Sequence, residues 1–222
     1  MKKINKFIIT LVISLIVCLP LVCSQAQSKG NLESEYQKIV KQLKQFPIKD
    51  LKNFDYFNFR KIAYQSGHMQ ESIDDDLEDQ YHAALNNKNY GEAIGICEKI
   101  LDKDYTNSKF HTMKSYFHIK LDRNKEIIAR HIAIARGLRG SILAVGDGRS
   151  FDTAWHVFLV REEYDLLKYL GFFTLIQQNL VYNNDNPYDV LDAQNKEGET
   201  RKFYFDVSDV PSMNIMKEIK QK

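Results

Sequence analysis

The sequence is poor in cysteine, which excludes a disulfide-stabilised fold. Only three cysteines occur in 222 residues. Cys18 and Cys23 lie within or beside an apolar N-terminal run, which leaves Cys97 as the one cysteine after it. A single cysteine forms no intramolecular disulfide, so we expect a hydrophobic core to stabilise the fold, with Cys97 as a small apolar member of it.

A surplus of one charge is also lacking once the N-terminus is set apart. The whole chain has 31 basic and 29 acidic residues. Removing Lys2, Lys3 and Lys6 leaves 28 basic residues against the same 29 acidic ones. A protein that binds the phosphate backbone needs clustered positive charge, so we expect no nucleic-acid partner.

The N-terminus predicts export. Lys2, Lys3 and Lys6 precede an apolar run from residue 7 to residue 22, and Ser24-Gln25-Ala26 supplies small residues for a signal peptidase. The run is shorter than the ~20 residues that span a bilayer, so we expect residues 1–26 to be a cleaved signal peptide and the mature protein to have no permanent transmembrane span. The alternative is a lipoprotein modified at Cys23, which Pro20 and Val22 disfavour.

Residues 27–140 predict packed helical hairpins. Shifting the chain by 34 positions places Glu92 on Glu126, Ala93 on Ile127 and Leu85 on Ile119. That period is typical of tetratricopeptide repeats, and an ordinary helical bundle stays open as the alternative. Helices are also expected at 31–46 and 51–64, and Asp74-Asp75-Asp76 indicates a helix N-terminus rather than a calcium loop.

Residues 141–210 change character and predict a small β-α-β-β-β unit. A breaker cluster at 144–150 is followed by an expected strand at 155–160, a helix at 161–170 and strands at 172–182, 188–193 and 201–207. The predicted fold class is therefore α+β, with tetratricopeptide-like hairpins packed on a small sheet. Residues 211–222 form a lysine-rich tail.

The order of short motifs in this region resembles a known family. The motifs are Ser141-Ile142-Leu143, Gly146-Asp147-Gly148, Thr153-Ala154, Glu162-Glu163-Tyr164-Asp165-Leu166-Leu167, Leu170-Gly171, Tyr188-Asp189 and Phe203-Tyr204-Phe205-Asp206. Together they resemble an uncharacterised domain-of-unknown-function family of exported bacterial proteins. The resemblance implies tetratricopeptide-like helices before a small mixed α/β domain, and it implies no reaction.

The sharpest local feature is the loop Gly146-Asp147-Gly148. Its glycines either free backbone amides to face an anion or allow a sharp turn into the next strand, and we favour the turn. Asp147, His156 and Glu163 are the weak candidates for an acid–base cluster. No hydrolase motif and no dinucleotide fingerprint accompanies them.

Three histidines of the hairpins, His111, His118 and His131, raise the possibility of a zinc site. Spacing alone does not show that they converge, so we expect no metal there and no cofactor.

The first helices of the two hairpins, 77–86 and 109–121, are expected to line a concave face. They carry Tyr81, His82, Lys114 and Tyr116, which suit contacts with an envelope protein or peptide. The leading hypothesis is a non-catalytic exported interaction module, periplasmic or secreted. The alternative is a small hydrolase or ligand-binding domain using Gly146-Asp147-Gly148 and His156.

Cleavage of the leader is directly measurable. Mass spectrometry of the protein recovered from envelope fractions should give Gln27 as the first residue, because Ala26 occupies the position that a signal peptidase reads. A mature form beginning at lipid-modified Cys23 would instead establish a lipoprotein.

Overall fold

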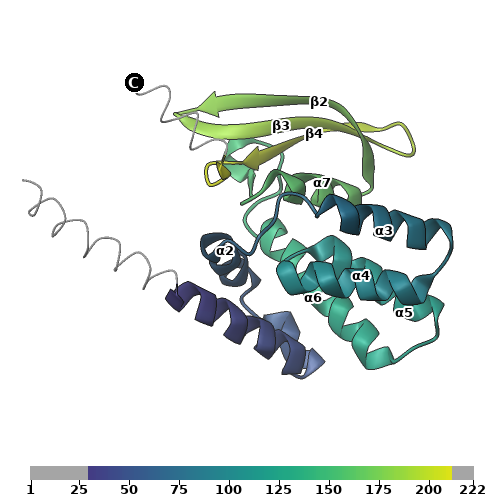
Figure 1. Ribbon diagram of the computed structural model, residues 1–222. Coiled ribbons are helices and arrows are strands. Elements are labelled where there is room, and N and C mark those ends of the chain that lie inside the picture. The colour runs from purple at the N-terminus through teal and green to yellow at the C-terminus, as the bar shows by residue number, and fades with distance from the viewer. Residues whose placement is uncertain (1–29, 212–222) are drawn as a thin grey trace, which may run out of the picture.

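The computed structural model describes residues 30–211, in which a helical part is followed by a small sheet (Figure 1). The predicted α+β fold class is confirmed. The helical part consists of a helix at 30–45, η1 (Ile48–Asn53), α2 (Tyr56–Ser66), α3 (Asp75–Asn86), α4 (Tyr90–Lys103), α5 (Ser108–Lys120) and α6 (Lys125–Leu143). The remainder consists of η2 (Phe151–Thr153), β1 (Trp155–His156), α7 (Val160–Tyr169), β2 (Phe172–Asn183), β3 (Asn186–Asn195) and β4 (Thr200–Asp206).

Short polar side chains set the starts of the hairpin helices. In each case an Asp or Asn oxygen accepts a hydrogen bond from a backbone N–H of the first turn, which satisfies a donor that the helix itself leaves unpaired. These capping residues are Asp74, Asn89, Asn107 and Asn124. The prediction that Asp74-Asp75-Asp76 marks a helix N-terminus is confirmed.

The prediction of a single helix at 51–64 is wrong. The chain forms η1 and then α2, with a break at Phe54 and Asp55. Asp55 accepts the backbone N–H of Asn58 at 2.9 Å and so starts a new helix within the aromatic run. The sequence pattern of that run was compatible with one helix because a cap is a local interaction that does not disturb the apolar spacing.

Consecutive helices of the hairpin region pack on one another, α3 on α4, α4 on α5 and α5 on α6. Aromatic rings fill the space between them, as where Tyr81 and Phe110 meet edge to face with their centroids 5.2 Å apart. Cys97 is buried among these helices, and burial raises the pKa of its thiol to about 12, which suits a core residue and not a nucleophile. The tetratricopeptide type of packing stays a prediction.

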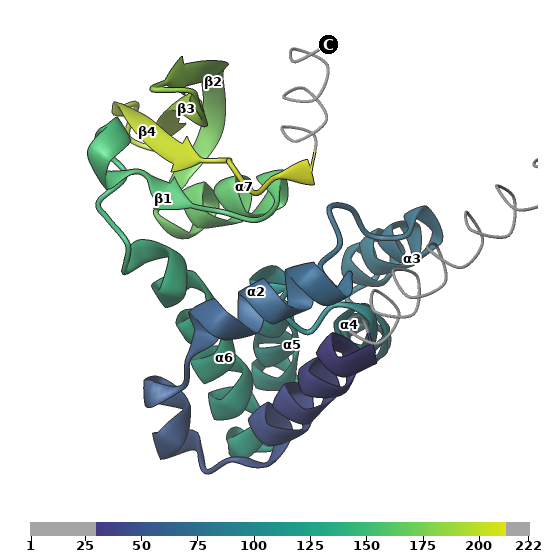
Figure 2. The same ribbon diagram turned by 90° about the vertical axis from the view of Figure 1, so that its left-hand side faces the viewer.

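The sheet has the strand order β1-β4-β3-β2, with β1 parallel to β4 and the other pairs antiparallel. The turn between β2 and β3 contains Asn184 and Asp185, whose φ angles of 50° and 64° fit a two-residue type I′ hairpin. α7 lies between the sheet and the helices in both views (Figures 1 and 2). Its Leu166 and Leu167 pack with Phe203 and other buried residues of the sheet in a second hydrophobic cluster.

The strand predicted at 155–160 is too long. Only Trp155 and His156 pair with β4. The N–H of Val157 still donates to the carbonyl of Asp206, but the N–H of Phe158 donates to the Glu162 carboxylate at 2.9 Å. The Glu162 side chain of the following helix thus accepts the N–H that would otherwise continue the pairing with β4. The strand ends there and the chain continues into α7.

A buried ion pair joins the helices to the sheet unit. The Arg60 guanidinium of α2 donates two hydrogen bonds of 2.8 Å to the Glu162 carboxylate of α7. Arg60 is 1% exposed, and its other contacts are Ser141 and the His156 carbonyl, both at 3.4 Å. Burial alone would raise the pKa of Glu162, but the charge and hydrogen bonds of Arg60, the charge of Arg161 and the Phe158 N–H together outweigh it, and the pKa is lowered.

Some sequence predictions concern residues outside the part of the chain that the structure describes. These are the signal peptide, residues 1–26, and the tail beyond residue 211. Within residues 30–211, no helix combines the length and the apolar character needed to cross a bilayer.

Arg60→Met should destabilise the protein by about 3–5 kcal/mol, because it leaves the Glu162 carboxylate buried without its partner. Urea unfolding of wild type, Arg60→Met and Arg60→Met/Glu162→Met measures this. The double variant should recover much of the loss, since it removes both charges together. Equal stability of wild type and Arg60→Met would show that the pair does not hold the two parts together.

Candidate functional site

A polar loop, residues 67–74, connects α2 to α3 and forms one wall of the candidate site. α2 ends at Gly67, whose φ of 81° lies in the left-handed region. The loop ends at Asp74, whose carboxylate accepts the Leu77 N–H at 3.4 Å. Both ends of the loop are therefore fixed by helix termini.

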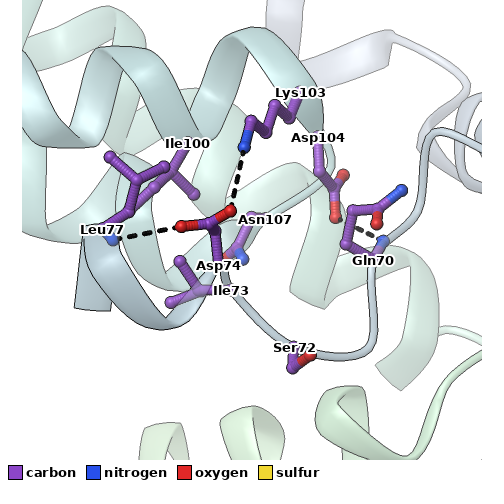
Figure 3. A pocket seen from close by; sticks show the side chains of 9 residues that line it. All are labelled: Gln70, Ser72, Ile73, Asp74, Leu77, Ile100, Lys103, Asp104 and Asn107. Carbon is purple, nitrogen blue, oxygen red and sulfur yellow. Dashed lines mark hydrogen bonds and ion pairs between the residues drawn. The ribbon is translucent and has the colours of Figure 1, made fainter. Parts of the chain in front are cut away.

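A pocket of about 260 Å³ opens between this loop, α3 and α4 (Figure 3). Ile73, Leu77 and Ile100 form its apolar part. Polar side chains complete the lining: Gln70, Ser72, Asp74, Lys103, Asp104 and Asn107. The volume lies below the ~300–1,000 Å³ of pockets for drug-sized ligands, so this pocket suits one or two side chains rather than a cofactor.

Asp104 fixes the polar rim of this pocket. It is 1% exposed, and its carboxylate accepts the N–H of Gln70 at 3.1 Å and that of Thr106 at 2.9 Å. It also forms an ion pair with the Arg161 guanidinium of α7. One buried carboxylate therefore holds the loop, the α4–α5 connection and α7 in a fixed arrangement.

Charges of both signs face solvent at the mouth of the pocket. Lys103 Nζ lies 3.8 Å from the Asp74 carboxylate, and more than half of each side chain is exposed. Such an exposed ion pair contributes little to stability. Lys103 and Asp74 can therefore separate and pair with charged groups of a ligand instead.

A second hollow, of about 250 Å³, adjoins the first and shares Gln70, Ser72, Ile73 and Asn107 with it. It extends to Arg161 and Asp165 of α7 and to Lys109 of α5. Glu71 accepts the backbone N–H of Arg161 at 2.8 Å, so the loop also contacts α7 directly. The two hollows together form a surface at the helix–sheet junction that we call the junction groove.

The sequence matches the family model of a domain of unknown function, DUF4919, over residues 24–217. The chain belongs to this family. Comparison with curated proteins and with solved structures gave no match. The predicted membership of an uncharacterised family is confirmed, whereas bacterial origin and export stay predictions.

In this DUF4919 chain, Asp147 serves the loop that contains it. Its carboxylate accepts the Thr153 hydroxyl at 2.6 Å and the Arg149 N–H at 3.1 Å, and these bonds lower the pKa of Asp147. The N–H of Gly148 donates to the Thr153 carbonyl at 2.8 Å. Two of the amides that an anion would need are therefore already used within the loop.

The two glycines of the loop allow close approaches. A Cβ on Gly146 would lie 2.2 Å from the Thr153 carbonyl oxygen, and one on Gly148 would lie 2.6 Å from the Trp155 ring. Gly148 also has a φ of 67°. These contacts agree with the turn interpretation of Gly146-Asp147-Gly148 and give the glycines a structural role.

His156 and Glu163 lie in different surroundings. His156 Nε2 is 3.0 Å from the Asp209 carboxylate, and its ring meets Phe158 edge to face. Glu163 is fully buried beside Asp189 of β3. Asp147 and His156 thus have different partners and Glu163 is buried elsewhere, so the structure does not bring the three proposed acid–base residues together as one cluster.

The carboxyl group of Glu163 is kept protonated at neutral pH. Burial raises its pKa to about 9, and the nearby Asp189 and Glu71 carboxyls add to the rise. Asp189 in turn accepts a hydrogen bond from Gln178 of β2 at 2.8 Å. Glu163 lines neither hollow of the junction groove, so its place is the interface between α7 and the sheet.

The predicted partner-binding residues do not share one exposed face. Tyr81 is buried at 4% exposure and packs in the core, because it follows Leu77 by one helical turn on the inward side of α3. The Lys114 side chain is mostly covered and pairs with Glu98 at 2.9 Å. His82 and Tyr116 are exposed.

Two of the three histidines considered for zinc bond to each other. His111 Nε2 lies 2.9 Å from the Tyr105 carbonyl, which only accepts, so this nitrogen carries the proton. His111 Nδ1 therefore accepts the bond of 2.7 Å from His131 Nδ1–H. Both nitrogen atoms of His118 are buried and find no hydrogen-bond partner among residues 30–211. Within residues 30–211, no three His, Cys, Asp or Glu side chains are grouped to hold a metal ion.

The residues that build the junction groove were not singled out from the sequence. Gln70, Asn107 and Asp104 lie in polar connections between helices, and connections are where binding residues concentrate. The sequence therefore contained an indication of these three residues in the polar character of the connections. The pairing of Asp104 with Arg161, 57 residues later, had no counterpart in the sequence pattern.

Burial lowers the pKa of His111 to about 3 and that of His131 to about 2. The unfolded chain binds protons on these rings below pH 6.5 and the folded protein does not, so stability falls as pH decreases from 6.5 toward 3. His131→Gln should reduce this loss between pH 6.5 and 5 by up to about 1.4 kcal/mol per pH unit.

The free energy of unfolding, measured by urea titration at several pH values, checks this. Glu163→Gln is the matched control, because the pKa shift of Glu163 changes stability with pH in the opposite direction. Its raised pKa makes the folded state bind the extra proton, so wild-type stability contributed by Glu163 is lost as pH rises from about 4.5 to 9. Identical pH slopes for wild type and His131→Gln would contradict the neutral histidine pair.

Proposed function

We propose that this protein is a non-catalytic binding module that holds a short extended peptide segment of a partner protein in the junction groove. The main observation that supports this proposal is the pocket in which Ile73, Leu77 and Ile100 lie beside a polar rim. An apolar side chain of the peptide would rest on these three residues. The polar rim would hydrogen-bond the peptide backbone next to it.

The size and charges of the groove support a peptide. Two hollows of about 260 and 250 Å³ lie side by side and share loop residues, which suits successive side chains of one segment. Lys103 and Lys109 face these hollows together with Asp74 and Asp165. A segment with charged residues of both signs around one apolar side chain would complement this pattern.

The alternative of a small hydrolase or ligand-binding domain has less support. It relied on Gly146-Asp147-Gly148 and His156. Asp147 is engaged with Thr153 and Arg149, and His156 with Asp209. General acid–base catalysis needs its groups within reach of one substrate, and these contacts direct the two side chains to different partners.

The cellular location of the protein is proposed from the N-terminal segment alone. Residues 1–26 have the pattern of a cleaved signal peptide, so the partner would be an envelope protein or a peptide outside the cytoplasm.

Ser72→Trp should abolish peptide binding without unfolding the protein. Ser72 is exposed on the loop and lines both hollows, so an indole there would fill them from the solvent side. Binding to an array of short peptides, followed by fluorescence polarisation of the best binder, measures the effect.

Ser72→Ala is the matched control and should bind as wild type does, because it removes only a hydroxyl. Small transient interfaces bind weakly, so we expect a dissociation constant in the micromolar range for the wild type. Saturable binding that Ser72→Trp leaves unchanged would place the peptide elsewhere, and the absence of any saturable binder would refute the proposal.

A further inference from the structure

β2 (Phe172–Asn183) forms one edge of the sheet along its full length (Figure 1). The opposite edge consists of the two residues of β1 and of the part of β4 that β1 does not reach. Register shifts occur between Phe172 and Thr174 and between Leu175 and Gln177. From Gln177 to Asn183 the pairing with β3 is regular, which leaves a straight stretch of open edge.

The hairpin geometry shows which backbone groups face outward. Asn183 and Asn186 are paired and close a two-residue turn, so they exchange hydrogen bonds. In an antiparallel pair such bonds recur at every second residue, here at Val181 and Asn179. The N–H and C=O groups of Leu180 and Gln178 therefore point away from β3, toward the open edge.

The side chains of β2 lack the protection that natural edge strands usually have. No Asp, Glu, Lys, Arg or Pro occurs between residues 172 and 184. Phe173 is 52% exposed, Leu175 40% and Ile176 56%. Edge strands are normally guarded by charge or proline, and a long neutral apolar edge is a template for another strand.

Charge on this sheet is found on β3 and β4 instead. β3, which is paired on both sides, carries Asp189 and Asp192. β4 carries Arg201 and Lys202 in the part that β1 does not reach, so these two charges lie on the other edge of the sheet. β2 is neutral although its neighbour β3 is charged and the other edge of the sheet carries Arg201 and Lys202, which indicates that β2 has a reason to avoid charge.

We propose that β2 pairs antiparallel with β2 of a second copy of this chain. In a two-fold antiparallel arrangement a residue on the axis faces its own copy, and the residues on either side of the axis face each other, so charges of one sign on the strand would be brought close together. A strand without charges avoids this repulsion when it pairs with itself. A charged peptide would instead be matched by opposite charges, which β2 does not have.

A two-fold axis beside Asn179 sets Gln178 of one copy opposite Leu180 of the other. It also sets Ile176 opposite Tyr182, so that side chains exposed in one copy cover each other in two. The pairing joins two four-stranded sheets into one continuous sheet and leaves the junction groove open, since no residue of β2 lines it.

Sedimentation equilibrium of the folded protein tests this. Wild type should show twice the chain mass, with a concentration-dependent dissociation. Asn179→Lys and Asn179→Glu should each raise the dimer dissociation constant about tenfold or more, because each places like charges together. An equimolar mixture of the two variants should recover dimers, since the lysine and the glutamate then face each other.

Asn87→Lys, the same change at an exposed position after α3, is the matched control and should dimerise as wild type does. Circular dichroism establishes that every variant is folded. A wild type that stays monomeric at all concentrations overturns the proposal. So does an Asn179→Lys variant that dimerises normally, or a mixture of the two charge variants that recovers no dimer.

Discussion

The arrangement of the molecule depends on one buried ion pair, Arg60 with Glu162. Two charged groups removed from water are costly unless each finds a partner, so the pair holds α2 and α7 at the one distance that satisfies both. The guanidinium also packs 5.2 Å from the Phe158 ring. Because Glu162 accepts the Phe158 N–H as well, the same carboxylate ends β1 and starts α7. The Glu162 carboxylate therefore both connects the helical part to the sheet unit and sets where the chain leaves β1 and enters α7.

The first turn of α7 extends this role over three consecutive residues. Arg161 pairs with Asp104 of the helical part, Glu162 with Arg60, and Glu163 lies against Asp189 of the sheet. Successive residues of a helix point about 100° apart, so three adjacent side chains reach three different surfaces. α7 is thereby fixed against the helices on one side and the sheet on the other, and the junction groove forms where its Arg161 meets the loop at 67–74.

The elements that could be predicted from the sequence are those governed by local rules. Apolar spacing predicted the hairpin helices and the strands at 172–182, 188–193 and 201–207, because periodicity acts over a few residues. The strand at 155–160 was overextended because its end is set by Glu162, a side chain that a strand pattern does not include. Tyr81 was placed on the surface because helical spacing does not tell which face of a helix is covered by its neighbours. The groove could not be predicted because Asp104, Gln70 and Arg161 come together only through the tertiary fold.

The contacts of α7 also relate the groove to the sheet edge. Arg161 lines the groove and Glu163 follows two residues later. Glu163 lies against Asp189, and Asp189 accepts a hydrogen bond from Gln178 of β2. The backbone of α7, which carries both Arg161 and Glu163, and the contacts of Asp189 therefore fix the position of the edge strand relative to the groove. Such a set of contacts transmits a change only if one of its members has two discrete arrangements. The burial of Glu162 and Glu163 opposes a second arrangement, because moving the Glu162 carboxylate would break its pairing with Arg60 in an apolar interior. The network is therefore best understood as a rigid connection, and a peptide in the groove and a second chain at β2 would be held by one framework without influencing each other's affinity.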